Sequence, residues 1–385
     1  MKYFVCILPL ALMITVLSSC STGSYLEMSG GIPIVHLKGT PYERGAAHGQ
    51  MLKEEIHESI SKWEQELESV FERDFEELID EFFNTTSYLE SIETVDPELL
   101  DELFGMSETS LIAYKILLAF QMSEELFTVL DQEARSNCTS IGKAGTDSTA
   151  CMLGQNMDPP QFLHGHPIVL HIIPDNGNPE SLIFSVPGLL GLAGMNDRGV
   201  AVTCMGISML KHAREGLPVI SVIRKILSQP DLEGAEAFMR QCAFAIPQCF
   251  GVGDPGGLRC FECSANQLAE FYPFEGKDVL LHTNYSIENK DFNQGFIALL
   301  AHYGKSVDDP YFCPRYFHAY DKIEAYGRSL DRERLGTILR LPEPELEPIL
   351  NENTLGTLVM ELDEDPRLFL APGHLEDASF ITISF

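Results

Sequence analysis

The sequence predicts an α+β protein in which helices and strands are grouped along the chain. Residues 41–135 carry apolar side chains three and four positions apart, the spacing of amphipathic helices. After residue 138 the pattern changes to short β-like runs separated by Gly, Pro and Asn-Asp turns. Grouped elements favour stacked α and β layers over regular βαβ alternation. We find no internal repeat and no low-complexity linker.

The first twenty residues are typical of an export signal. Met1-Lys2 is followed by an apolar run from Tyr3 to Leu17 and then by Ser18-Ser19-Cys20. The run is short for a membrane-spanning helix, and no later segment is long enough to span a bilayer. Leu17-Ser18-Ser19-Cys20 resembles a bacterial lipobox, which predicts that Cys20 is diacylated and becomes the new N-terminus. The alternative is an ordinary cleaved signal in which Cys20 has no role.

A lipid on Cys20 would place the protein in the bacterial cell envelope, held on a membrane and facing the periplasm or the exterior. Each buried CH₂ of an acyl chain contributes about 0.8 kcal/mol, so several chains would hold the protein there.

The elements that follow the signal are predicted in chain order. Residues 21–31 form a short polar tether, and residues 32–37 form a first strand, which Pro33 places at a sheet edge or at a strand start. Residues 56–82 continue the helical pattern, with the intervening glutamates on its solvated face. Further helices are expected at 99–104 and 111–126.

The second part of the chain alternates between strands and a few helices. The β-like runs are 150–153, 168–173, 181–186, 200–205, 268–272 and 380–385. The helical stretches are 219–227, 233–242 and 315–326.

Composition excludes some functions. The chain has 385 residues, enough for one large domain or two ordinary ones, and 45% of them are hydrophobic, so a sizeable core can be buried. The 26 Lys and Arg against 57 Asp and Glu give a net charge of −31. Such an acidic surface repels phosphate backbones, which argues against nucleic-acid binding. We interpret the charge as a device for solubility rather than for steering a substrate.

The cysteines indicate neither a disulfide framework nor a metal. Eight remain besides Cys6 in the signal and Cys20, and their spacing is irregular. Cys260 and Cys263 form one CxxC in a strand-like segment, where residues three apart point to opposite faces. No HExxH pattern is present. We therefore expect no metal and no cofactor.

Chemistry-bearing residues occur where the helical part meets the β part. Cys138 opens this boundary, and Asp158 follows twenty residues later. Two antiparallel strands joined by a turn at 142–147 would return Asp158 to the neighbourhood of Cys138. An acid in that place can orient groups around a nucleophile, although a cysteine is more commonly a small buried apolar residue.

Six motifs in order resemble one enzyme family. They are Gly39-Thr40-Pro41-Tyr42-Glu43-Arg44-Gly45-Ala46-Ala47-His48-Gly49, Glu102-Leu103-Phe104-Gly105-Met106-Ser107, Cys138-Thr139-Ser140, Gln155-Asn156-Met157-Asp158, Gly194-Met195-Asn196-Asp197-Arg198-Gly199-Val200 and His282-Thr283-Asn284-Tyr285. The family is that of the acyl-coenzyme A:6-aminopenicillanic acid acyltransferases, within the N-terminal-nucleophile (Ntn) hydrolases and related to the choloylglycine hydrolases. The resemblance runs from about residue 32 to the C-terminus.

The resemblance implies a four-layer αββα sandwich and a self-processing precursor. Cleavage between Asn137 and Cys138 would separate a mainly helical fragment, 21–137, from a fragment, 138–385, that carries the nucleophile. Residues 32–137 and 138–385 would form one fold together.

The resemblance also implies roles for individual residues. The freed α-amino group of Cys138 would be the general base for its own thiol; an α-amine has a pKa of about 7.7–8.0 and a thiol about 8.5, so modest help suffices. Asp158 would hold that amine, Asn284 would donate to the oxyanion, and Arg315 matches an arginine near the nucleophile. As alternatives, Asp158 and Asn284 could be turn formers and Arg315 a surface ion-pair residue. The residues assigned to substrate contact are Gln155, Asn156 and His282, with a structural role as the alternative for His282.

The reaction implied is acyl transfer from a small, linear N-acyl amide, not a peptide, through an acyl-enzyme on Cys138. The acyl group passes to water or to an amine, and an acyl-coenzyme A or amine acceptor is a conceivable partner. Four positions depart from the family pattern: Asn137, where a small residue is usual; Gln155, where an arginine is common; and Met205 and Cys249, where an asparagine is expected. These departures keep an alternative open, a lipid-anchored binding protein that has lost activity on the same fold.

Overall fold

The computed structural model describes residues 23–130, 137–147, 149–274, 278–309 and 313–385. The predicted export signal and its Cys20 lie outside these residues. Within the described ranges, no helix combines the length and apolar character needed to cross a membrane.

The strands form two sheets. One has nine strands in the order β1-β2-β5-β6-β7-β8-β9-β10-β11, and the other has six in the order β12-β3-β4-β13-β14-β15. The strands are β1 Tyr25–Ser29, β2 Ile32–Gly39, β3 Thr139–Lys143, β4 Cys151–Met157, β5 Ile168–Pro174, β6 Ser181–Ser185, β7 Ala193–Asn196, β8 Ala201–Gly206, β9 Gln248–Asp254, β10 Gly257–Cys263, β11 Leu268–Glu270, β12 Val279–His282, β13 Gly356–Leu362, β14 Arg367–Pro372 and β15 Ile381–Ile383.

The α-helices are α1 Pro41–Met51, α2 Lys53–Phe71, α3 Phe75–Thr85, α4 Tyr88–Val95, α5 Pro97–Ser110, α6 Tyr114–Gln121, α7 Ser123–Val129, α8 Val219–Leu227, α9 Leu232–Gln241, α10 Gln294–His302, α11 Pro314–Tyr326 and α12 Arg332–Leu339.

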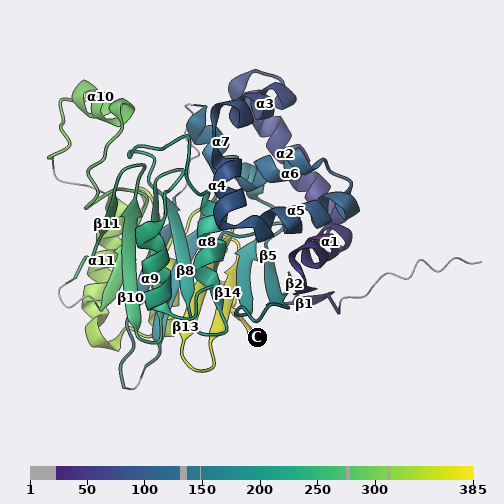
Figure 1. Ribbon diagram of the computed structural model, residues 1–385. Coiled ribbons are helices and arrows are strands. Elements are labelled where there is room, and N and C mark those ends of the chain that lie inside the picture. The colour runs from purple at the N-terminus through teal and green to yellow at the C-terminus, as the bar shows by residue number, and fades with distance from the viewer. Residues whose placement is uncertain (1–22, 131–136, 148, 275–277, 310–312) are drawn as a thin grey trace, which may run out of the picture.

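The two sheets face each other and carry helices on their outer sides. Strands β3 and β4 contact β8 and β9 across the interface, and β12 contacts β10. Helices α8 and α9 pack on the nine-stranded sheet, while α11 and α12 pack on the six-stranded one. Figure 1 shows this succession, with α1–α7 gathered beside the β1 end of the larger sheet. The expected αββα arrangement is thereby confirmed.

The N-terminal segment differs from the prediction at its start. The expected polar tether contains a strand, β1, that pairs antiparallel with β2. Gly30 and Gly31 both have positive φ, at 56° and 85°, and make the two-residue loop that such a hairpin requires. β2 also pairs in parallel with β5, so it is not an edge strand; Pro33 is nevertheless its second residue, close to the strand start as expected.

The long helical pattern is divided into shorter helices. α2 ends where Glu72 adopts a left-handed conformation, and α3 begins after Asp74, whose side chain accepts a hydrogen bond from Glu77 N. The predicted helix at 111–126 is likewise split into α6 and α7. Local capping thus breaks a periodicity that the apolar pattern alone suggests is continuous.

Two of the six motifs contact each other in the crossing of α1 and α5. A Cβ added to Gly45 would lie 1.6 Å from the carbonyl oxygen of Glu102, so only glycine permits this approach. At the same place Glu102 is fully buried between Arg44, at 3.1 Å, and Arg224 of α8, at 2.8 Å. This ionic triad ties the N-terminal helices to the outer layer of the sandwich.

Candidate active site

The hairpin of β3 and β4 brings Cys138 and Asp158 together. Cys138 immediately precedes β3, and Thr139 pairs with Asn156 near the end of β4. The backbone N–H of Asp158 consequently donates to Cys138 Sγ at 3.4 Å, as the predicted turn requires. The cysteine side chain is buried, with 3% of its surface exposed.

Asp158 is a buried acid with one unused oxygen. Its Oδ2 accepts a hydrogen bond from Asn351 Nδ2 at 2.5 Å, while Oδ1 is buried and meets no donor among the residues that the structure describes. Burial raises the pKa of this carboxyl group to about 7, an effect that Thr354, Asn351 and Arg315 partly offset. Within the described residues, Oδ1 is therefore an acceptor open to a further donor.

The thiol of Cys138 is strongly held in its neutral form. Burial, followed by the charge of Asp158, raises its pKa to about 12, while the Asp158 N–H, Gln155 and Arg315 act in the opposite direction. In this structure the thiol is consequently a poor nucleophile near neutral pH.

Arg315 connects the backbone at Asn137 to Asn284. It lies in the first turn of α11, where Nη1 donates to the carbonyl oxygen of Asn137 at 2.5 Å. Nη2 donates to Asn284 Oδ1 at 3.2 Å, and Asn284 Nδ2 in turn donates to the carbonyl oxygen of Gly206 at 3.2 Å. Cys138, Asp158, Asn284 and Arg315 thus belong to one locus, although they come from three separate parts of the chain.

Gln155 lies in the same locus but serves the contact between the sheets. Its Nε2 donates to the carbonyl oxygen of Cys204 at 2.5 Å, and its Oε1 accepts from Cys204 N at 3.0 Å. Both polar atoms of the amide are therefore occupied by the backbone of β8. Gln155 nevertheless lies near enough to the Cys138 thiol to lower its pKa.

The structure does not bring the side chains of Asn156 and His282 to Cys138. Successive residues of a strand face opposite sides, so Asn156 turns away from Cys138. Its Nδ2 donates to the carbonyl oxygen of Ile349 at 2.9 Å, and its Oδ1 accepts from Thr357 Oγ1 at 2.8 Å. His282 is fully buried and bonds to Glu262 at 2.7 Å. Neither side chain lines the pocket, so the substrate contacts expected of them are not supported.

A small pocket with a volume of about 70 Å³ lies beside Cys138. Its apolar wall consists of Met157, Phe162, Leu163, Leu189, Leu192, Val219, Ile220 and Ile223. Its polar lining consists of Gln121, Ser123, Glu124, Glu125, Cys204 and Gln248. The mainly apolar lining suits a molecule with a sizeable apolar part.

Two acids of α7 line this pocket, and sequence reasoning missed both of them. Burial raises the pKa of Glu124 to about 6 and that of Glu125 to about 8. Glu124 Oε1 accepts from Gln248 Nε2, and Glu125 Oε1 accepts from Val219 N, both at 2.8 Å. In the sequence they resemble the solvated glutamates of the neighbouring helices, so only the tertiary packing distinguishes them.

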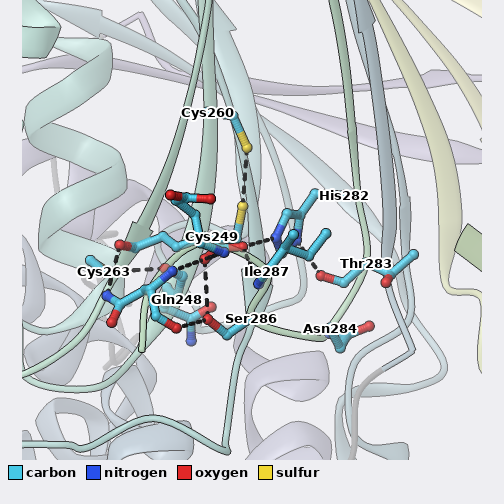
Figure 2. A network of polar contacts seen from close by, with 12 residues as sticks. Gln248, Cys249, Cys260, Cys263, His282, Thr283, Asn284, Ser286 and Ile287 are labelled. Carbon is cyan, nitrogen blue, oxygen red and sulfur yellow. Dashed lines mark hydrogen bonds and ion pairs between the residues drawn. The ribbon is translucent and has the colours of Figure 1, made fainter. Parts of the chain in front are cut away.

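The CxxC cysteines have separate surroundings. Cys260 Sγ lies 3.4 Å from Cys249 Sγ on the neighbouring strand, whereas Cys263 Sγ donates to the carbonyl oxygen of Gln248 at 3.1 Å (Figure 2). In the described parts of the chain, no three His, Cys, Asp or Glu side chains gather as a metal site would require.

Comparison with known proteins gives limited likenesses. No protein-family model matches the chain. Protein dcd1B of Dictyostelium discoideum is 25% identical over 223 residues, which are 52% of this chain and 43% of that protein. The chain thus matches less than half the length of this relative.

Solved structures with a similar arrangement include three amide hydrolases. They are an N-acylethanolamine-hydrolyzing acid amidase ortholog of Caenorhabditis elegans (19% identity, 58% of this chain and 92% of that one, TM-score 0.42), penicillin V acylase of Agrobacterium tumefaciens (15%, 64% and 86%, 0.40) and a mutant conjugated bile acid hydrolase of Clostridium perfringens (15%, 64% and 92%, 0.41). Identities and TM-scores this low do not establish a shared family or activity.

Proposed function

We propose that this chain is a self-processing cysteine Ntn hydrolase that cleaves or transfers the acyl group of a small N-acyl amide. One observation carries the proposal: the Asn137–Cys138 peptide bond lies in the candidate site itself. The guanidinium of Arg315 donates to the carbonyl oxygen of Asn137, and the adjoining Cys138 lines the pocket. A cation on that oxygen favours nucleophilic attack at the attached carbon, because it stabilises the charge that develops there.

Processing would follow from this geometry. Cys138 Sγ attacks the carbonyl carbon of Asn137, the thiol proton passes to the departing nitrogen, and the peptide C–N bond breaks to leave a thioester. Water then hydrolyses the thioester, which gives a carboxylate on Asn137 and a free thiol on Cys138. The new α-amine of Cys138 would supply a donor to Asp158 Oδ1, which has none among the described residues of the uncut chain.

Turnover would use the same groups in a second role. The freed α-amine takes the proton of the Cys138 thiol, and its positive charge beside the sulfur favours the thiolate. The thiolate attacks the amide carbonyl of the substrate, and the leaving amine departs with that proton. The acyl-enzyme then passes its acyl group to water or to an acceptor amine.

Mass measurement of the intact protein tests the proposal. We expect wild-type protein to yield two fragments divided between Asn137 and Cys138, and Cys138→Ala to remain a single chain. A matched control is Cys151→Ala, which removes another buried thiol of β4 that lies outside the pocket and should still be cut. An uncut wild-type chain, with no labelling of Cys138 by a thiol-reactive acyl probe, would contradict the proposal.

A catalytically degenerate binding protein is the second candidate, and two contacts favour it. Asn284 Nδ2 donates to the Gly206 carbonyl oxygen, and both polar atoms of Gln155 are held by the backbone of Cys204. Loss of one oxyanion donor costs about 10²–10³ in rate. Protein that is cut but forms no acyl-enzyme with any of a panel of N-acyl amino acids and lactams would favour this candidate.

Attachment to the bacterial cell envelope through Cys20 is a separate proposal that the leader sequence supports. Cells producing the wild type should carry the protein in the membrane fraction, and those producing Cys20→Ala should not. Equal membrane association of both forms would refute a lipid on Cys20.

A further inference from the structure

Glu262 of β10 is a buried carboxylate that the chemistry described above does not use. It is fully buried and would be costly to leave without partners. Burial by itself raises its pKa, but His282 and the backbone N–H groups around the carboxylate outweigh that effect and hold the pKa below the usual range, so it is ionised. Such a buried charge persists where the surrounding groups are arranged to satisfy it.

One loop supplies most of the partners of this carboxylate. Backbone N–H groups of Ile287 and Glu288 donate at 2.8 Å and that of Asn289 at 2.7 Å. Ser286 Oγ lies 3.1 Å from Glu262 Oε2 and 2.5 Å from the Asn289 carbonyl oxygen, so its single proton is shared between these two acceptors. The segment 286–289 therefore wraps around the carboxylate as a turn closes around an anion.

The same carboxylate holds the other side of the loop through His282. His282 Nε2 lies 2.7 Å from Glu262 Oε1, and its Nδ1 donates to the carbonyl oxygen of Thr283. A carbonyl can only accept, so Nδ1 bears the hydrogen. Burial lowers the pKa of His282, but the bond to Glu262 outweighs burial and raises the pKa above its ordinary value. The imidazolium thus links the carboxylate to the backbone directly before Asn284.

Asn284 lies between these two attachments. Thr283 is fixed on one side and Ser286 on the other, as Figure 2 shows for the labelled residues of this loop. In the orientation that the loop gives it, the Asn284 amide contacts both Arg315 Nη2 and the Gly206 carbonyl oxygen.

We propose that Glu262, acting through His282 and the turn at 286–289, is a positioning residue that sets Asn284 in the active site. The inference rests on the proposed function, because it assigns Glu262 a role in the acyl transfer that Asn284 assists. Glu262 itself touches no reacting atom; its effect is transmitted through the loop.

The test measures acylation of Cys138 by para-nitrophenyl acetate in self-processed protein. The rate constant of the para-nitrophenol burst reports acylation, and the concentration giving half the maximal rate reports binding. We expect Glu262→Gln to lower the rate constant about 10²-fold, as loss of an oxyanion donor does, with little change in the half-saturating concentration. The acylation rate constant of Asn284→Ala should fall by a similar factor. The double variant Glu262→Gln/Asn284→Ala should be acylated no more slowly than Asn284→Ala alone.

Asp291→Asn is the matched control. Asp291 is also a buried carboxylate at the end of this loop, but it bonds to Lys211, Ser264 and Asn266 instead. Its effect on the rate constant should multiply with that of Asn284→Ala, because no bond of the Asp291 carboxylate is to Glu262 or His282. If Glu262→Gln fails to fold, Ser286→Ala gives a milder perturbation of the same turn. It should lower the acylation rate constant about threefold, and this effect should disappear in the Asn284→Ala background.

Three results separate the possible failures. Wild-type rates in Glu262→Gln, or in Ser286→Ala where that variant replaces it, would overturn the positioning role alone. The positioning role would also be overturned if either variant lowered the acylation rate constant by the same factor in the Asn284→Ala background as in the wild type. A wild-type protein without a burst, or a Cys138→Ala variant with an equal burst, would overturn the proposed function and this inference with it.

Discussion

Replacement of Glu125 by glutamine should remove a large part of the pH dependence of stability. Glu125 is 1% exposed, and burial raises its pKa from 4.5 to about 8. Between these two values the unfolded chain releases the proton while the folded chain keeps it. The folded state then binds more protons, so stability falls as pH rises through this window and is constant below it.

The expected magnitude follows from the width of the window. One proton contributes about 1.4 kcal/mol per pH unit, so the protein should lose about 3 kcal/mol of unfolding free energy between pH 4.5 and 7 through Glu125 alone. Asp158 and Glu124 have pKa values raised in the same direction and add to the loss. The glutamine of the variant cannot ionise but still offers an oxygen to the Val219 N–H.

Urea unfolding at pH 5, 6, 7 and 8 measures this effect, in a Cys138→Ala background that keeps one chain. The plot of unfolding free energy against pH should be less steep in Glu125→Gln by about one proton. Glu66→Gln, a change at an exposed position of α2, serves as the control and should leave the slope as in the parent. Equal slopes in the parent and in Glu125→Gln would show that burial does not shift this carboxyl group.

Three further outcomes follow from contacts elsewhere in the molecule. Gly45→Ala should destabilise the protein by about 3 kcal/mol or more, seen as a lower Tm, because the added Cβ would overlap the Glu102 carbonyl oxygen; an unchanged Tm would contradict the tight crossing. Asn351→Ala should slow self-cleavage about tenfold on a denaturing gel time course, since Asp158 loses its hydrogen bond; a wild-type rate would exclude that support. The two fragments cut at Asn137–Cys138 should co-elute in gel filtration and separate only under denaturing conditions, because β2 and β5 belong to one sheet; separate elution would contradict it.

Local patterns predict the elements that local forces determine. The helix expected at 219–227 occurs with those bounds as α8, since its apolar stripe and flanking residues are all near in sequence. The hairpin that returns Asp158 to Cys138 is also a local structure. The Gly30-Gly31 turn is a comparable signal that marks β1, and it is easily overlooked because the flanking residues look like a polar tether.

Non-local partners are beyond the reach of such patterns. Asn351 meets Asp158 across a long stretch of sequence, through the placement of β13 beside β4. Glu262 resembles any strand glutamate until the loop at 286–289 closes around it. The type of a residue shows what chemistry it can do, but whether a carboxylate is solvated or enclosed depends on strand pairings that no short segment encodes.

The contacts of the uncut chain indicate how one set of groups could serve two reactions in turn. Before cleavage the Cys138 thiol has a pKa raised to about 12, and Asp158 Oδ1 has no donor within the described structure, so the site is unsuited to turnover. Arg315 meanwhile contacts the carbonyl oxygen of the peptide bond whose cleavage would free the α-amine of Cys138. In the proposed mechanism, cleavage supplies both the donor for Asp158 and the base for the thiol. The enzyme would then become active only through processing. The Asn137–Cys138 peptide bond that blocks the α-amine would be the first bond that Cys138 attacks.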